Sequence, residues 1–403
     1  MNKRLQGRAL VWSLVIIAGI SASGAAQAVD ICKDDRPDGL REWERQMVDR
    51  GKVWGSYLGP RSEATPKQKL VNEFYDSAHT FYRISDYLQQ DEPWTTYAEY
   101  ALSVYRDGYL VPNNWRAAGW RRSSHGLYEN FKRGGDVTLE ELEFLRDRPA
   151  YSNIREGRDQ GGSEQRSRAI ALAVQAHVHA ERAGSDRGTE NGVEQLSVFV
   201  PWMGSHLYEW RTGNYQGRYP RNIPRFAPFM FGMTSHALIE YYEWEREQGE
   251  DPNRYWPTEW PIDYGQAAVA ETPKITWETI PDALADVAMW AVEEAEHETG
   301  VPMLQVDRRG EAFLYQSIKK VRPAYDLNLM IAHVYAWLWK ETGDVEFREI
   351  GDRLFATGAR AGSTNSGKHF NQQYRMAFDF IEWRRAGDEK YCAAAKLDAE
   401  SGD

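Results

Sequence analysis

Apolar residues recur at a spacing of three to four along most of this chain, which is the period of an α-helix with one buried face. Segment 71–88, for example, carries Phe74, Ala78 and Phe81 at this spacing. Strand signals are few and short, at 195–200 and 313–315. The pattern therefore predicts a mostly helical protein, with helices at 71–88, 94–105, 166–183, 229–247, 280–299, 325–342, 346–361 and 371–385.

The predicted helices alternate between two kinds. Segments 229–247 and 325–342 are rich in aromatic residues, Ala and His, whereas 282–296 and 347–360 are plainer amphipathic helices. Repeated helical hairpins must stack to bury their apolar faces, either in an open solenoid or in a closed ring. Apolar helices paired with more polar ones suit a closed double ring. We therefore expect an all-α protein, an (α/α) toroid of stacked helical hairpins.

Two of these hairpins resemble those of the six-hairpin (α/α)-toroid superfamily. The resemblance lies in Pro228-Phe229-Met230-Phe231-Gly232 followed by Tyr241-Tyr242, and in 326–329 followed by Trp337-Leu338-Trp339 and a Thr342-Gly343-Asp344 turn. These patterns extend over roughly 166–386 and are hairpin patterns, not catalytic signatures. The superfamily includes polysaccharide lyases, glycoside hydrolases, sugar epimerases and a few terpene enzymes. The resemblance implies a carbohydrate-active enzyme without selecting one family.

The first 28 residues have the features of an export signal. Lys3, Arg4 and Arg8 precede an apolar run at 9–20, and small residues then lead to Ala26-Gln27-Ala28. A signal peptidase reads an A-x-A pattern of this kind. An uncleaved membrane anchor is the alternative, but the apolar run is short for a bilayer span. We expect a secreted or periplasmic protein with one domain over 29–403, since no linker is evident, and no membrane association after cleavage.

The chain has two cysteines, Cys32 and Cys392, near the two ends of the predicted domain. An exported protein meets an oxidising environment, in which a disulfide bond is favoured. We predict a Cys32–Cys392 bond, which would join the two ends of the domain. Two unpaired thiols on frayed termini are the alternative.

The formal net charge of −11 argues against nucleic acid as a general partner, because binding to phosphates needs a basic surface. A carbohydrate partner suits the aromatic content better. The chain holds 16 Trp and 22 Tyr, and several lie in predicted loops. Aromatic faces pack on the C–H surfaces of sugar rings, and their polar edges can donate to hydroxyl groups. The loop aromatic residues are Trp115, Trp120, Trp202, Tyr215, Tyr219, Trp256 and Trp260.

Three segments predicted as loops combine His, Tyr, Arg and Asn. They are 202–225, 362–375 and 113–128, and the first two lead into predicted helices. Long connections of this composition are uncommon unless they have a function. A solvated surface loop or a helix cap is the structural alternative for each of them.

We expect the first two loops to converge on one cleft with His236. The predicted catalytic residues are His206, Tyr208, His236, His369 and Tyr374. A Tyr or His would transfer the proton, and a nearby Arg would lower the pKa of the Tyr. The predicted substrate-binding residues are His125, Trp202, Arg211, Asn365 and Arg375.

This residue set favours a polysaccharide lyase that cleaves a uronate-containing polymer by β-elimination. Glycoside hydrolysis, which needs two carboxylates across the scissile bond, remains an alternative, although no pair of carboxylates stands out. A periplasmic binding or scaffold protein and a toroid isomerase or dehydratase also remain open. No metal or cofactor is predicted, because His177 and His179 should point to different helix faces and no phosphate-binding glycine loop occurs.

Overall fold

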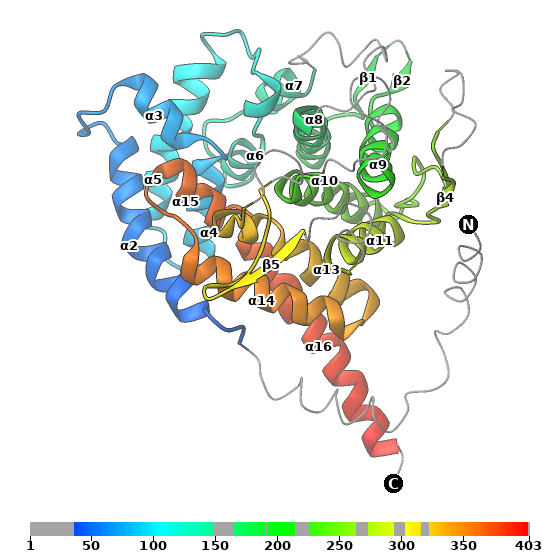
Figure 1. Cartoon of the computed structure of the whole chain (residues 1–403). Helices are drawn as coiled ribbons and strands as arrows, with labels where there is room; N and C mark the ends of the chain where they lie inside the picture. Colours follow the sequence, from blue (N-terminus) through cyan, green and yellow to red (C-terminus); the bar gives the residue numbers. More distant parts are fainter. Residues whose placement is uncertain are drawn as a thin grey trace.

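The computed structural model describes residues 36–147, 164–190, 192–213, 226–262, 273–293, 303–315 and 322–401. Helices dominate these segments, and the strands form three short antiparallel pairs (Figure 1). The predicted all-α class is therefore confirmed. Within these segments, no helix has both the length and the apolar character that a bilayer crossing requires.

The α-helices begin and end as follows: α2 Leu40–Leu58, α3 Pro66–Glu73, α4 Ser77–Leu88, α5 Trp94–Leu102, α6 His125–Lys132, α7 Leu139–Asp147, α8 Glu164–Arg182, α9 Leu196–Thr212, α10 Pro228–Glu247, α11 Ile280–Glu293, α13 Ala332–Thr342, α14 Val345–Ala361, α15 Gly367–Tyr374 and α16 Ala377–Ser401. A π-helix, η1, and two 3₁₀ helices, η2 and η3, occupy Ser103–Leu110, Gly119–Arg121 and Tyr325–Met330. The paired strands are β1 Thr189–Glu190 with β2 Val193–Glu194, β3 Glu259–Trp260 with β4 Ile275–Thr276, and β5 Leu304–Asp307 with β6 Gly310–Phe313.

Three predicted helices are each divided in two, and one of them, 325–342, consists of η3 followed by α13. The segment 71–88 is interrupted between α3 and α4, where Tyr75 and Asp76 take left-handed backbone conformations. The Asp76 side chain then caps α4 by accepting a hydrogen bond from the His79 backbone N–H. The segment 371–385 is likewise split between α15 and α16.

Segment 195–200 was predicted as a strand, and this prediction is wrong. It begins α9, a helix that runs to Thr212 and therefore also includes half of the predicted loop at 202–225. Leu196, Phe199 and Met203 are buried on this helix at helical spacing. This helical period over a longer segment determines the structure, whereas the short apolar run at 195–200 alone does not distinguish a strand from a helix. Residues 214–225 lie outside the described part of the chain.

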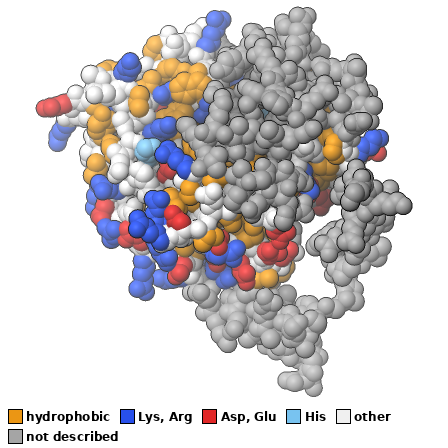
Figure 2. All heavy atoms as spheres, in the orientation of Figure 1, with side chains coloured by type: hydrophobic (Ala, Val, Ile, Leu, Met, Phe, Trp, Pro, Cys, Tyr) orange, Lys and Arg blue, Asp and Glu red, His pale blue; other side chains and the backbone are white. Residues whose placement is uncertain are grey.

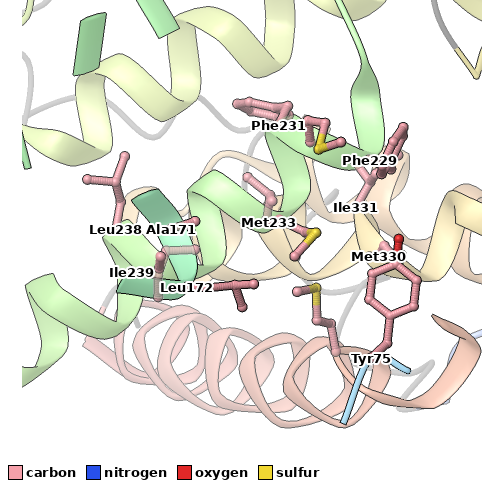
Figure 3. Packing of buried hydrophobic residues seen from close by; sticks show 14 of the residues in the cluster. Tyr75, Ala171, Leu172, Phe229, Phe231, Met233, Leu238, Ile239, Met330 and Ile331 are labelled. Carbon is pink, nitrogen blue, oxygen red and sulfur yellow. The ribbon is translucent and has the colours of Figure 1, made fainter. Parts of the chain in front are cut away.

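The hydrophobic core lies between helices that come from distant parts of the sequence. Side chains of α8, α10 and η3 meet in it, among them Leu172, Met233 and Met330 (Figure 3). Gly232 allows the close approach of α10 to η3, because a Cβ atom there would lie 2.0 Å from the backbone oxygen of Met330. On the described part of the face in Figure 2, basic and acidic side chains are interspersed.

The export signal at 1–28 and the residue Cys32 lie outside the described residues. Cys392 lies on α16. The predicted signal cleavage and the Cys32–Cys392 bond therefore stay predictions.

Candidate functional site

Six helices contribute side chains to one cavity of about 630 Å³. The lining residues come from α4, α6, α8, α10, α13 and α16, so the cavity gathers residues from 79 to 383. A volume of this size is typical of small-molecule sites in proteins. This cavity is the candidate functional site.

Four histidines line the cavity, each from a different helix. His79 lies on α4, His125 begins α6, His179 is on α8 and His236 is on α10. The His125 ring lies within 5.4 Å, centroid to centroid, of each of the other three. The histidines therefore form one continuous cluster, which we call the histidine cluster.

Two carboxylates contact the histidine cluster. His125 Nε2 lies 2.5 Å from Glu240 Oε1, and His236 Nε2 lies 3.0 Å from Asp379 Oδ2. Asp379 also pairs with Arg83, whose Nη2 is 3.1 Å from its Oδ1. Each carboxylate is therefore held by a histidine, and Asp379 is held by a cation as well.

The Nδ1 atoms of His125 and His236 also have hydrogen-bond partners. Arg375 Nη2 lies 3.4 Å from His125 Nδ1 and donates to Gln175 Oε1 at 3.2 Å. Gln175 Nε2 lies 2.9 Å from His236 Nδ1. The third ring, that of His179, has its Nδ1 2.7 Å from the Ser124 hydroxyl oxygen.

Burial lowers the pKa values of His79, His125 and His179 well below the ordinary histidine value, so these rings are neutral. Burial opposes ionisation of Glu240, but His236 and nearby arginines hold the pKa of this carboxyl below its ordinary value. Burial is likewise overcome at Asp379, where Arg83 and His236 lower the pKa to about 2. The histidine cluster and its two carboxylates therefore combine neutral imidazoles with ionised carboxylates.

The rest of the lining is aromatic and charged. Tyr128 and Trp244 stand on α6 and α10, and Trp383 stands on α16. Opposite charges are paired, as in Lys340 with Glu243 at 2.7 Å. The lining cations are Arg83, Lys132, Arg182 and Lys340, and the lining acids are Glu129, Glu240, Glu243, Glu247 and Asp379.

His125, His179 and Glu240 carry ligand-type atoms within 4.8 Å of one another, a set that suits zinc by residue type. The distances between these ligand atoms, however, do not fit a zinc site. Two ligands at about 2.0–2.2 Å from a tetrahedral zinc ion lie more than about 3 Å apart. His125 Nε2 and Glu240 Oε1 are 2.5 Å apart, which is a hydrogen-bond distance.

The structure brings three of the predicted site residues together. His125 and His236 line the cavity, and Arg375 lies directly behind them in contact with His125. Arg375 is buried, and it follows α15 in the break before α16. These residues come from three different predicted loops or helices, so their proximity is a result of the tertiary fold.

The four predicted residues on α9 do not line the cavity, which corrects the expected convergence. The Tyr208 hydroxyl donates to the backbone oxygen of Pro273, and Arg211 pairs with Asp286. His206 stacks on Trp210, and Trp202 packs near Phe199. Because α9 continues through this segment as a helix, its side chains pack against neighbouring helices instead of entering a common cleft.

The predicted residues before and on α15 are also separate from the cavity. Asn365 is exposed in the preceding loop, and His369 lies in the first turn, where its N–H is capped by Ser366. The Tyr374 hydroxyl donates to the backbone oxygen of Trp43 at 2.9 Å. Burial raises the pKa of Tyr374 well above the ordinary tyrosine value, so this residue is unsuited to act as a base.

The sequence pattern did not indicate Glu240, His179 or Asp379 as site residues. One usable signal was present, because His236 and Glu240 are four residues apart on a predicted helix and therefore share a face. The prediction that His177 and His179 point to different faces is confirmed, since His177 packs on Phe199. Asp379 could not be paired with His236 from a separation of 143 residues.

Comparison of the chain with known protein families, with characterised proteins and with solved structures finds no match.

Proposed function

We propose that this chain is a polysaccharide lyase that cleaves a uronate-containing carbohydrate by β-elimination in the cavity of the histidine cluster. The observation that carries the proposal is the stacked pair of His179 and Tyr128, with ring centroids 5.0 Å apart, beside an ionised Glu240. These three residues give the cavity a neutral base, a hydroxyl group and a negative charge.

A sugar ring is the ligand that best suits the lining. Tyr128, Trp244 and Trp383 offer aromatic surface, while charged and imidazole groups offer hydrogen bonds to hydroxyl groups. The volume of about 630 Å³ is sufficient for a short segment of a polysaccharide.

His179 is the proposed base. If its Nδ1–H donates to the Ser124 hydroxyl oxygen, its Nε2 keeps a lone pair, and that atom lies 3.9 Å from Glu240 Oε1. The ionised Glu240 then stabilises the imidazolium that forms when His179 takes a proton. His79 is less suited, because neither of its buried ring nitrogens has a hydrogen-bond partner that would fix the position of its proton.

The elimination proceeds with a balanced transfer of two protons. His179 takes the proton from the carbon beside the uronate carboxylate, and the electron pair forms the new carbon–carbon double bond. The bond from the neighbouring carbon to the leaving oxygen breaks, and the Tyr128 hydroxyl gives its proton to that oxygen. Proton return from His179 to Tyr128 restores the resting state.

Arg182 and Lys132 are the proposed partners of the substrate carboxylate. Arg182 lies one turn beyond His179 on α8, and Lys132 lies one turn beyond Tyr128 on α6, so each cation shares a face with a reacting group. The lining as a whole carries slightly more acids than cations. The uronate must therefore be held by individual cations and not by the net charge of the cavity.

A glycoside hydrolase is the second candidate, because Glu240 and Asp379 line the same cavity. A hydrolase needs one carboxylic acid whose raised pKa keeps it protonated. The pKa values of Glu240, Glu243 and Asp379 are all lowered. This state of the carboxylates favours elimination over hydrolysis.

The contacts among the lining helices support the closed ring that the sequence led us to expect. Helices α8 and α10 pack together, as do α13 and α16. Arg83 of α4 pairs with Asp379 and with Glu382 of α16, which joins the first lining helix to the last. We propose that the six lining helices are the inner ring of an (α/α) toroid.

The test is to incubate the purified protein with uronate-containing and neutral polysaccharides. A lyase produces the ultraviolet absorbance of an unsaturated uronate from the former only. Release of reducing ends without that absorbance would favour the hydrolase. Tight binding of a polysaccharide without any cleavage would identify a binding protein and overturn the enzymatic proposal.

A further inference from the structure

We propose that Arg375 and Gln175 are positioning residues that fix which ring nitrogen carries the proton in both His125 and His236. Neither residue lines the cavity, and both are almost completely buried. The proton positions follow from hydrogen-bond chemistry alone. Only their catalytic consequence rests on the proposed lyase function.

Arg375 decides the direction of these hydrogen bonds, because a guanidinium group can donate hydrogen bonds and cannot accept them. Its Nη2 lies 3.4 Å from His125 Nδ1, so this nitrogen must be the acceptor. A neutral imidazole has one donor and one acceptor. The proton of His125 is therefore on Nε2, which donates to Glu240 Oε1 at 2.5 Å.

The same guanidinium nitrogen orients Gln175. Because Arg375 donates to Gln175 Oε1 at 3.2 Å, the amide nitrogen must point the other way, to His236 Nδ1 at 2.9 Å. The amide nitrogen is a donor, so His236 Nδ1 accepts. His236 therefore donates its Nε2 proton to Asp379 Oδ2 at 3.0 Å.

One buried cation thus sets the protons of two rings. His125 and His236 each have both nitrogens engaged, which leaves neither of them free to act as a base. Their Nε2 protons stabilise the negative charges of Glu240 and Asp379. In the proposed reaction, this keeps Glu240 available as the anion beside His179, so the sequence-based assignment of His236 as a catalytic group is replaced by a supporting role.

The first test uses the unaltered protein. Selective ¹⁵N labelling of the histidines and long-range ¹H–¹⁵N spectra report which ring nitrogen carries a proton. His125 and His236 are assigned by single substitution to Gln. We expect the proton on Nε2 of both rings, and a proton on Nδ1 of either neutral ring would overturn the proposal. This measurement needs no substrate and is unaffected by failure of the lyase hypothesis.

The second test is Gln175→Glu, which keeps the size of the side chain and its pairing with Arg375 but replaces the amide donor by an acceptor. We expect His236 Nδ1 to gain a proton in this variant. That proton would be donated to the new carboxylate at position 175. The positive charge of the His236 ring, whose Nδ1 lies 3.9 Å from Glu240 Oε2, would then compete with His179 for the negative charge of Glu240. With an accepted uronate substrate, kcat should fall by about tenfold or more while KM changes little.

The matched control is Gln373→Glu, another buried glutamine, whose amide donates to the backbone oxygen of Asp326 away from the cavity. This control should leave the protons of His125 and His236 unchanged and should retain kcat. If Gln175→Glu folds and His236 Nδ1 stays unprotonated, the positioning role of Gln175 is wrong. An equal loss of kcat in both variants would reduce that role to general packing.

Discussion

The rings of His179 and Tyr128 are stacked, with their planes only 11° apart, although the two residues lie on different helices of the cavity wall. Helix α8 supplies the imidazole and α6 supplies the phenol. Ser124, just before α6, holds His179 Nδ1, so both rings are positioned by the same end of α6. A base and a proton donor are therefore fixed relative to each other before any substrate binds.

Removing either reacting group, the imidazole of His179 or the hydroxyl of Tyr128, should abolish most of the proposed activity. We expect His179→Gln and Tyr128→Phe each to lower kcat by about 10²- to 10⁴-fold, the usual effect of removing a general acid or base. The measurement is the initial rate of ultraviolet absorbance on an accepted uronate substrate. Tyr242→Phe is the control, because Tyr242 packs against Trp337 and does not line the cavity.

The control variant should retain the parent rate, and all three variants should keep the parent melting temperature within a few degrees. Full activity in both His179→Gln and Tyr128→Phe would eliminate this pair as the reacting groups. Loss of activity in Tyr242→Phe as well would indicate that the assay reports stability.

Removal of metal ions should leave the protein unchanged. A zinc ion between His125, His179 and Glu240 would have to replace the proton that joins His125 Nε2 to Glu240, and Arg375 occupies the other nitrogen of that ring. We therefore expect elemental analysis to find zinc well below one equivalent. Dialysis against a chelator should alter neither the melting temperature nor the rate.

One equivalent of zinc, lost on chelation together with stability and restored by zinc but not magnesium, would contradict this prediction. It would also show that Arg375 moves away from His125 when the metal binds.

A carboxyl outside the cavity should give the folded protein a pH-dependent stability. Burial, together with the negative charge of Asp76, raises the pKa of Glu73 to about 8 from an ordinary value near 4.5. Between pH 4.5 and about 8, Glu73 keeps its proton in the folded state, whereas in the unfolded state it has released that proton. The contribution of Glu73 to the free energy of unfolding is therefore complete below pH 4.5 and is lost as the pH rises to about 8.

The measurement is denaturant unfolding of the parent and of Glu73→Gln at a series of pH values. The stability of the parent relative to the variant should fall by up to about 1.4 kcal/mol per pH unit between pH 4.5 and 8, and then level off. A difference that is constant across this interval, or that grows in favour of the parent, would show that Glu73 is ionised in the folded protein.

The sequence was sufficient for the helical class and for several long helices. The expected segment 229–247 corresponds closely to α10, Pro228–Glu247, because Pro228 starts the helix where its missing N–H is not needed. Segment 346–361 corresponds to α14, which begins after the capping residue Asp344. Periodic apolar faces and caps are local features, and a single sequence displays them directly.

The cavity could be predicted only in part, because its chemistry depends on contacts between distant helices. His125 and His236 were chosen from local composition, whereas Gln175 and Asp379 have no local signal. The ring of His236 is defined by partners 61 and 143 residues away in the chain. The predicted convergence of His206 and Tyr208 on His236 fails for the opposite reason, since a His- and Tyr-rich stretch of a buried helix resembles a functional loop when its helical period is overlooked.

The approach of α10 to η3 beside the histidine cluster predicts a strict requirement for glycine at position 232. A Cβ atom there would lie 2.0 Å from the backbone oxygen of Met330 and 3.3 Å from the Cα atom of Ile331, and backbone atoms cannot rotate away as a side chain can. Gly232→Ala should therefore force the two elements apart and lower the free energy of unfolding by about 1–3 kcal/mol or more.

Gly108→Ala is the control, because the nearest atom to its added Cβ would be 3.5 Å away, at ordinary contact distance. That change should be neutral or stabilising by up to about 1 kcal/mol. Denaturant unfolding of both variants measures the difference, and equal stabilities would show that α10 and η3 can separate without loss of packing.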